Sequence, residues 1–203
     1  MKTDAVAFGV AGIAFGLIAG WIIGTQQASP RTPAGAPAAA SAPPVAGAGT
    51  RAAVLDEAQV TALKSVAERD ATSPKPRIDL ANLYFDAERY DDAIKWYGAA
   101  LKLNANDVDV STDLGVSYYY TNQPDKAIDQ LGQSLKIDPK HAKTLLNLGI
   151  VKAFGKQDLN GATEAWQQVI QLAPNSPEGQ AAKRALDSLQ SAHPGGVPQK
   201  PGA

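Results

Sequence analysis

The sequence lacks cysteine altogether and contains only two histidines, His141 and His193. Without cysteine, the chain has no disulfide and offers no thiolate for catalysis or metal binding. The two histidines are far apart in the sequence, so they do not form the closely spaced histidine pair of a helical metal site. We therefore expect neither a metal nor another cofactor.

The chain also lacks an excess of charge of either sign. Its 19 basic and 20 acidic residues give a formal net charge of -1, and no long basic or acidic block occurs. A nucleic-acid-binding protein would carry a basic patch or stripe. No nucleophile paired with a base, no carboxylate pair in apolar surroundings and no glycine-rich phosphate loop is recognisable. The sequence therefore predicts no nucleic-acid partner, no enzyme activity and no catalytic residue.

Apolar residues dominate the N-terminus. Residues 5–24, AVAFGVAGIAFGLIAGWIIG, contain no charge and no strongly polar side chain. In a helix, roughly 20 residues span about 30 Å, the thickness of the hydrocarbon layer of a membrane. A signal peptide has a shorter apolar core, of about 7 to 15 residues, and a cleavage site of small residues, which Gln26-Gln27 does not supply. We therefore predict an uncleaved, single-pass transmembrane anchor within residues 1–27.

Four glycines recur at every fourth position of this apolar run. They are Gly12, Gly16, Gly20 and Gly24. A step of four residues turns a helix by about 400°, so these glycines stay on one face. In a membrane such a face lets helices approach closely, and we predict that it packs against a second copy or another protein. The alternative is a chance alignment of small residues in a span rich in glycine and alanine.

Few charges define the orientation of this anchor. Lys2 and the amino terminus lie on one side and Arg31 on the other, which slightly favours a cytoplasmic N-terminus. The rest of the chain would then lie in the periplasm or outside the cell. Residues 28–50 are rich in proline, alanine, glycine and serine, a composition that predicts a disordered, extended linker. Residues 192–203 are predicted to be a disordered tail.

The middle of the chain repeats itself with a period of 34 residues. Leu80-Ala81, Leu114-Gly115 and Leu148-Gly149 are spaced by this period. The third unit needs one inserted residue in the segment KQDLNGA, near Asp158. Such a period, with small residues at fixed positions, predicts two antiparallel helices in each unit, stacked on those of the next.

This pattern resembles the tetratricopeptide repeat family, and the segment ANLYFDAERYDDAIKWYGAALKLNAND carries the closest match. Its family positions are occupied by Ala81, Tyr84, Ala93, Tyr97 and Ala100. The resemblance implies an all-α fold, a right-handed superhelix of three helical hairpins, in addition to the transmembrane helix. The three units are residues 74–107, 108–141 and 142–176. Lys152 and Val169 depart from the family pattern, so we expect the third unit to be the least regular.

We expect one more helix on each side of the repeats. Residues 51–72 are interpreted as an orphan second helix of a degenerate unit, because their end, ERDATSP, is similar to the ends of the later units. Residues 177–191 are predicted to form a capping helix, with Ser176 as the N-cap and Pro177 at the first helical position.

The resemblance also implies a surface for binding other proteins, because in this family the first helices of the units line a concave groove. Family members that clamp a C-terminal carboxylate use lysine and asparagine there. In this chain Ile78 replaces the lysine, whereas Asn82 and Asn147 remain. We therefore predict an apolar and aromatic groove for a peptide or helix of a partner protein. Its predicted lining residues are Ile78, Asn82, Phe85, Asp86, Thr112, Val116, Tyr119, Tyr120, Leu146, Asn147, Ile150 and Phe154.

An alternative for the aromatic residues is structural, because Tyr118 and Tyr120 could fill space between helices. The function predicted from the whole pattern is a membrane-anchored scaffold or adaptor on the periplasmic side. Anchored repeat proteins of similar build occur in the assembly of c-type cytochromes and other envelope complexes, which suggests a narrower role. A different class is a structural membrane protein that self-assembles through its glycine-rich helix.

Overall fold

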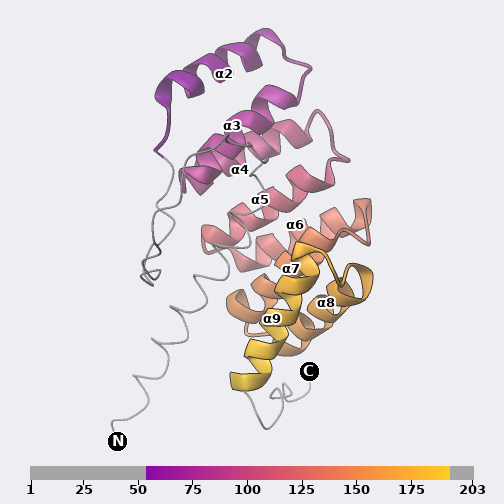
Figure 1. The fold of residues 1–203 in the computed structure, drawn as a ribbon. Helices are drawn as coiled ribbons and strands as arrows, with labels where there is room; N and C mark the ends of the chain where they lie inside the picture. The colour runs from indigo at the N-terminus through magenta and orange to yellow at the C-terminus, as the bar shows by residue number, and fades with distance from the viewer. Residues whose placement is uncertain (1–53, 193–203) are drawn as a thin grey trace, which may run out of the picture. The chain divides into compact units, whose positions relative to one another are not determined.

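The computed structural model describes residues 54–192, in which the chain forms eight α-helices, one π-helical turn and no strand (Figure 1). This confirms the predicted all-α fold of helical hairpins. The helices are α2 (Glu57–Arg69), α3 (Lys75–Asp86), α4 (Tyr90–Leu101), α5 (Val108–Tyr120), α6 (Pro124–Ile137), α7 (Ala142–Ile150), α8 (Leu159–Leu172) and α9 (Pro177–Ala192), and the π-helical turn η1 (Val151–Gly155) follows α7.

Several predictions concern residues outside this range. The anchor with its four glycines, the linker of residues 28–50 and the tail from residue 193 lie outside the described residues. None of the helices between residues 54 and 192 is long and apolar enough to cross a lipid bilayer.

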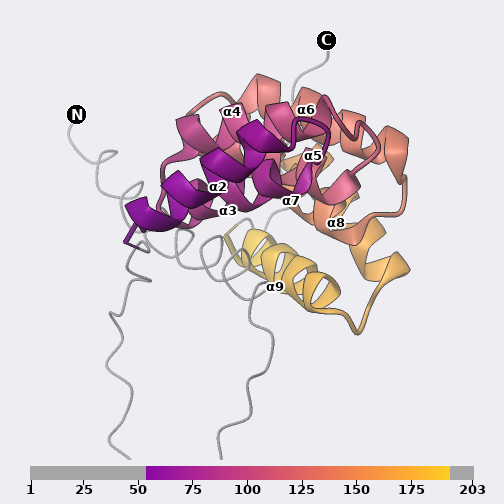
Figure 2. The same cartoon turned by 90° about the horizontal axis from the view of Figure 1, so that it is seen from above.

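The helices are stacked in chain order, from α2 at one end to α8 and α9 at the other (Figure 1). Three antiparallel hairpins, α3 with α4, α5 with α6, and α7 with α8, form the middle of the stack. Seen along the stack, α2 lies over α3 (Figure 2), and α9 packs on both α7 and α8. We call α3, α5 and α7 the first helices of the hairpins, and α4, α6 and α8 the second helices.

Side-chain caps define where several helices begin. Asp56, Asp107, Asp158 and Ser176 each accept a hydrogen bond of 3.0–3.1 Å from a backbone N–H in the first turn of the following helix. Such caps satisfy N–H groups that have no partner within the helix. The bond to Ser176 confirms this residue as the N-cap of α9, with Pro177 at the first helical position.

Each hairpin turns at a residue with a left-handed backbone. Glu88, Asn122 and Gln157 have φ angles of 57°, 58° and 55°. The first two are 122 - 88 = 34 residues apart and the last two 157 - 122 = 35. The extra residue of the third unit therefore lies before Gln157, where the helix widens into η1. This corrects the expectation of an insertion near Asp158.

The hydrogen bonds that close the hairpin turns also show the one extra residue of the third unit. The Gln123 N–H donates to the Tyr118 carbonyl oxygen, five residues back, at 2.9 Å. The equivalent Asp158 N–H donates to the Lys152 carbonyl oxygen, six residues back, at 2.8 Å. Because a π-helical turn holds one more residue than an α-helical turn, η1 absorbs the insertion and lets α8 start in register.

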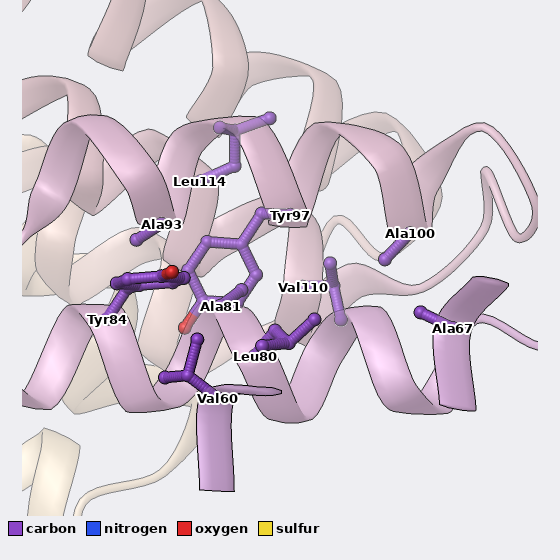
Figure 3. Packing of buried hydrophobic residues seen from close by; sticks show 10 residues of the cluster. All are labelled: Val60, Ala67, Leu80, Ala81, Tyr84, Ala93, Tyr97, Ala100, Val110 and Leu114. Atoms are coloured by element: carbon purple, nitrogen blue, oxygen red, sulfur yellow. The ribbon is translucent and has the colours of Figure 1, made fainter. Parts of the chain in front are cut away.

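Small residues on the first helices make room for large residues on the second helices. A Cβ atom added to Gly115 would lie 2.9 Å from Leu131 Cγ, and one added to Gly149 would overlap the indole of Trp166. In the first hairpin, Ala81 lies beside Tyr97 in the buried cluster that joins α2, α3, α4 and α5 (Figure 3). The recurring Leu-Ala and Leu-Gly pairs of the sequence are therefore contact points between paired helices.

Candidate partner-binding face

The first helices α5 and α7 contact each other, and α3 meets α5 through the rings of Phe85 and Tyr120; we call this side of the stack the first-helix face. The Thr112 and Thr144 hydroxyl oxygens, on α5 and α7, are 2.6 Å apart. The Lys143 ammonium and the Asp113 carboxylate join the same two helices at 2.8 Å. These polar contacts fix the register between neighbouring first helices, so side chains from different hairpins are held at defined distances.

Five of the predicted groove residues are buried. They are Thr112, Val116, Leu146, Asn147 and Ile150. Thr112 donates to the Val108 carbonyl oxygen at 2.7 Å and also contacts Thr144, and the Asn147 amide donates to the Lys143 carbonyl oxygen at 2.8 Å, so both side chains have partners within the protein. α7 packs against α8, α9 and α5, and its residues Leu146, Asn147 and Ile150 are buried. These five residues stabilise helix packing, which corrects the expectation that their side chains line an accessible groove.

The other predicted groove residues are at least partly accessible, and their role in binding stays a prediction. Ile78, Asn82, Phe85, Asp86, Tyr119, Tyr120 and Phe154 belong to this group. Phe154 is the most exposed of the apolar members, at 39 %. The Asn82 Oδ1 accepts a hydrogen bond of 2.7 Å from the Tyr97 hydroxyl of α4, which holds the amide in one orientation on the face.

Four aromatic rings from three helices meet at the end of the first-helix face where α3 and α5 terminate. We call Phe85, Tyr90, Tyr119 and Tyr120 the aromatic cluster. The rings of Tyr90 and Tyr120 are stacked, with centroids 4.5 Å apart and planes 14° apart. Phe85 meets both edge-on, at 5.2 Å from Tyr90 and 6.1 Å from Tyr120, and Tyr119 lies 5.7 Å from Tyr120. All four rings are half-buried.

Tyr90 is not among the predicted groove residues, because those residues all belong to the predicted first helices of the units. Tyr90 begins the second helix α4 and reaches the face across the hairpin turn. The equivalent residues of the later hairpins are Pro124 and Leu159. The one available signal was a lone aromatic residue at the start of a second helix.

Carboxyl groups lie near the aromatic cluster. Burial, followed by the charges of Glu88 and Asp86, raises the pKa of Tyr90 to about 12. Partial burial and the charge of Asp113 raise the pKa of Asp86 above its usual range. Burial also raises the pKa of Asp113, against the opposing effect of the Lys143 ammonium. The cluster therefore combines apolar ring surface with nearby carboxyl groups.

Between residues 54 and 192, no three histidine, aspartate or glutamate side chains are grouped so that they could hold a metal ion. Every buried side-chain nitrogen or oxygen in this range has a hydrogen-bond partner. The arrangement is suited to contact with another molecule through ring surface, amide and carboxyl groups.

Comparison with known protein families identifies the repeats. Residues 81–122 match the family described as TPR repeat, and residues 108–141 match the family described as tetratricopeptide repeat. The bovine (Bos taurus) BBSome complex member BBS4 is 34 % identical over 99 residues, which cover 49 % of this chain and 19 % of BBS4. The chain spans between 19 % and 33 % of the length of the first curated relatives that it matches.

Solved structures share the fold at low sequence identity. A crystal structure of MamA has a TM-score of 0.54 at 19 % identity, covering 66 % of this chain and 88 % of MamA. The first TPR of Spaghetti (RPAP3), bound to the HSP90 peptide SRMEEVD, has a TM-score of 0.50 at 20 % identity, covering 68 % of this chain and 95 % of that one. At such identities the likeness shows the helical repeat fold.

Proposed function

The chain carries tetratricopeptide repeats, and we propose that it is a protein–protein interaction module that binds a peptide or helix of a partner protein on its first-helix face. The observation that carries this proposal is the aromatic cluster, together with the exposed Phe154. Aromatic residues dominate the energetics of protein interfaces, where one anchoring ring contributes about 2 kcal/mol or more. The peptide bound by the first TPR of RPAP3 supports peptide binding as a use of this fold.

We further propose that the module is tethered to a membrane. The apolar run at residues 5–24 supports a single-pass anchor, and the linker of residues 28–50 would hold the repeats near partners in the same membrane. The weak charge bias favours the periplasmic side. Assembly of c-type cytochromes or another envelope complex is the proposed process, on the basis of similar build alone.

The binding proposal is tested with a double variant on the first-helix face. Full-length chain that carries Tyr119→Ala and Phe154→Ala is compared with wild type in a pull-down. The matched control is Leu103→Ala with Leu172→Ala, which removes two large apolar residues, 41 % and 43 % exposed, one just after α4 and one at the end of α8. We expect wild type and control to retain a partner that the first double variant loses, with all three equally helical by circular dichroism. If all three proteins retain the partner equally, the first-helix face is excluded as its binding site.

The membrane and process proposals need separate tests. Protease added to intact spheroplasts should cleave residues 54–192 if the repeats are periplasmic, and protection until lysis would overturn that placement. Deletion of the gene should remove haem-staining proteins if the process is cytochrome assembly. An unchanged cytochrome profile would exclude that process while leaving the binding proposal intact.

A further inference from the structure

We propose that the stack bends at one joint, where a polar seam between α5 and α7 opens and the third hairpin rotates with α9 relative to the first two hairpins. The polar seam consists of Asp109, Thr112 and Asp113 on α5 and of His141, Lys143 and Thr144 at the start of α7. This inference goes beyond partner binding, since it concerns how the stack itself changes shape. It is carried by the chemistry of the seam, the attachment of α7 to α6 and the apolar joint between the first two hairpins.

Ion pairs and hydrogen bonds hold the polar seam together. The Lys143 Nζ lies 2.8 Å from the Asp113 Oδ1, and these side chains are 24 % and 22 % exposed. The His141 Nε2 lies 3.5 Å from the Asp109 Oδ1. Polar groups that separate can bind water in place of each other, whereas separated apolar groups gain no such partner. A seam of this kind therefore opens at a lower cost in free energy than an apolar contact of the same size.

The hydroxyl groups of the seam form a chain of hydrogen bonds with a single direction. A threonine hydroxyl has one proton, and Thr112 donates its proton to the Val108 carbonyl oxygen at 2.7 Å. Thr144 therefore donates to Thr112, and the His141 Nδ1, 2.7 Å from the Thr144 oxygen, donates to Thr144. Because each donor in this chain depends on the next, we expect these contacts to form and break together.

α7 is attached to α6 at both of its ends. At its start, residues 138–141 connect the two helices by a turn, in which the His141 N–H donates to the Asp138 carbonyl oxygen at 3.2 Å. At its other end, Val151 of η1 packs in a buried apolar cluster with Leu131 of α6. Rotation about the line along which α6 and α7 meet would therefore separate α7 from α5 while both attachments persist.

The joint between the first two hairpins is built from apolar residues. Val110 and Leu114 of α5 lie in the same buried cluster as Leu80 of α3 (Figure 3). Opening of this joint would expose apolar side chains to water, which is unfavourable. We therefore expect the first two hairpins to move as one body, with the polar seam as the line along which the stack bends.

Spin labels on introduced cysteines measure the two joints separately, because the chain has no cysteine of its own. Asn106→Cys, before α5, with Gln180→Cys, in α9, gives a distance across the polar seam. Asn106→Cys with Glu68→Cys, in α2, gives a distance across the joint between the first two hairpins. All three labelled residues are exposed. Double electron–electron resonance on the full-length chain, at about pH 8 where carboxyl groups favour their charged form, records both distance distributions.

The first variant, Lys143→Met, removes the cation of the seam. It leaves the Asp113 carboxylate, whose charge burial and Asp109 disfavour, without its ion-pair partner. Because a carboxylate in this position must bind water instead, we expect the distance distribution across the seam to broaden and to shift to longer distances. The distribution across the other joint should stay unchanged. The matched control, Lys95→Met, removes the pair with Asp92 on α4 and should change neither distribution.

A double variant tests whether the uncompensated charge is the cause. Lys143→Met with Asp113→Leu replaces the ion pair by apolar side chains, which should close the seam and restore the wild-type distribution. If Lys143→Met loses its helical signal in circular dichroism, Asp109→Asn decides the question, because its side chain is 67 % exposed; we expect it to broaden the distribution across the seam alone.

Three results would overturn the polar seam as the bending joint. They are an unchanged distance across the seam in a folded Lys143→Met protein, equal lengthening across both joints, and a double variant that stays as open as the single one. Each of them would leave the proposed binding of a partner on the first-helix face standing.

Discussion

Trp166 of α8 lies directly against the backbone of Gly149 in α7, and its indole Nε1 donates a hydrogen bond to the Leu146 carbonyl oxygen at 3.2 Å. Trp166 is fully buried, so its ring has no free space into which to withdraw. The contact explains why the chain has glycine at this position of the third hairpin, although the first hairpin has Ala81. The large ring of Trp166 requires the smallest possible neighbour.

Replacement of this glycine should therefore destabilise the protein. In Gly149→Ala the new methyl group overlaps a rigid indole, and overpacking of this kind costs about 1–3 kcal/mol. The matched control is Gly132→Ala in α6, because a Cβ atom there would meet nothing within 4 Å. We expect the control to be stabilised by about 0.5–1 kcal/mol, since alanine favours helix over glycine. Urea unfolding monitored by circular dichroism measures both, and a neutral Gly149→Ala would contradict the contact.

In the hairpin turn before α8, we expect a substitution to raise the free energy of unfolding rather than to lower it. Gln157 has a φ angle of 55°, a conformation that side chains with a Cβ atom adopt at a cost of roughly 1 kcal/mol. We expect Gln157→Gly to raise the free energy of unfolding by up to about 1 kcal/mol. The same substitution at exposed Gln167, inside α8, should lower it by about 1 kcal/mol. Two changes of the same sign would show that backbone conformation is not the cause.

The Tyr97 hydroxyl positions an amide of the first-helix face. Tyr97→Phe removes its 2.7 Å hydrogen bond to Asn82 Oδ1, and we expect a loss of about 1 kcal/mol in the free energy of unfolding. The control is Tyr118→Phe, which removes a hydroxyl from a half-buried ring of the next hairpin. Chemical denaturation should show a clearly smaller effect for the control. Equal losses in both variants would mean that the hydrogen bond from Tyr97 to Asn82 does not itself stabilise the folded protein.

The raised pKa of Tyr90 predicts loss of stability in alkali. Its ordinary pKa of 10.0 applies to the unfolded chain, whereas burial and then the charges of Glu88 and Asp86 raise the folded value to about 12. Between these values the unfolded state has released a proton that the folded state retains, so stability falls as pH rises from about 10 to about 12. The urea midpoint should fall over this range, and less steeply in Tyr90→Phe. An identical slope in that variant would assign the effect to other groups.

The hairpins could be predicted from the sequence because their period is long and their contacts recur. A spacing of 34 residues places Leu114-Gly115 and Leu148-Gly149 at equivalent contacts, and one alignment defines both helices of a unit. The position of the extra residue could not be predicted in this way. The sequence between Ile150 and Asp158 accepts the insertion at several points, and only backbone hydrogen bonds place it in η1.

The site was predicted less completely than the fold. Alignment shows which side of a first helix faces its neighbours in the family, but the exposure of Thr112 or Leu146 depends on how closely adjacent helices pack. That packing joins residues far apart in the sequence, as the Thr112–Thr144 contact and the packing of α9 on α7 show. Tyr90 was missed because its neighbours, Phe85 and Tyr120, come together only in three dimensions.

The stacking of helices in chain order has a consequence for how the protein folds. Each helix packs mainly on those next to it in sequence, so the loops that must close during folding are short and the contact order is low. Folding of such a stack can nucleate in any hairpin and propagate to the next one. We expect each hairpin to be able to form during synthesis as soon as it leaves the ribosome, before the C-terminal helix has been made.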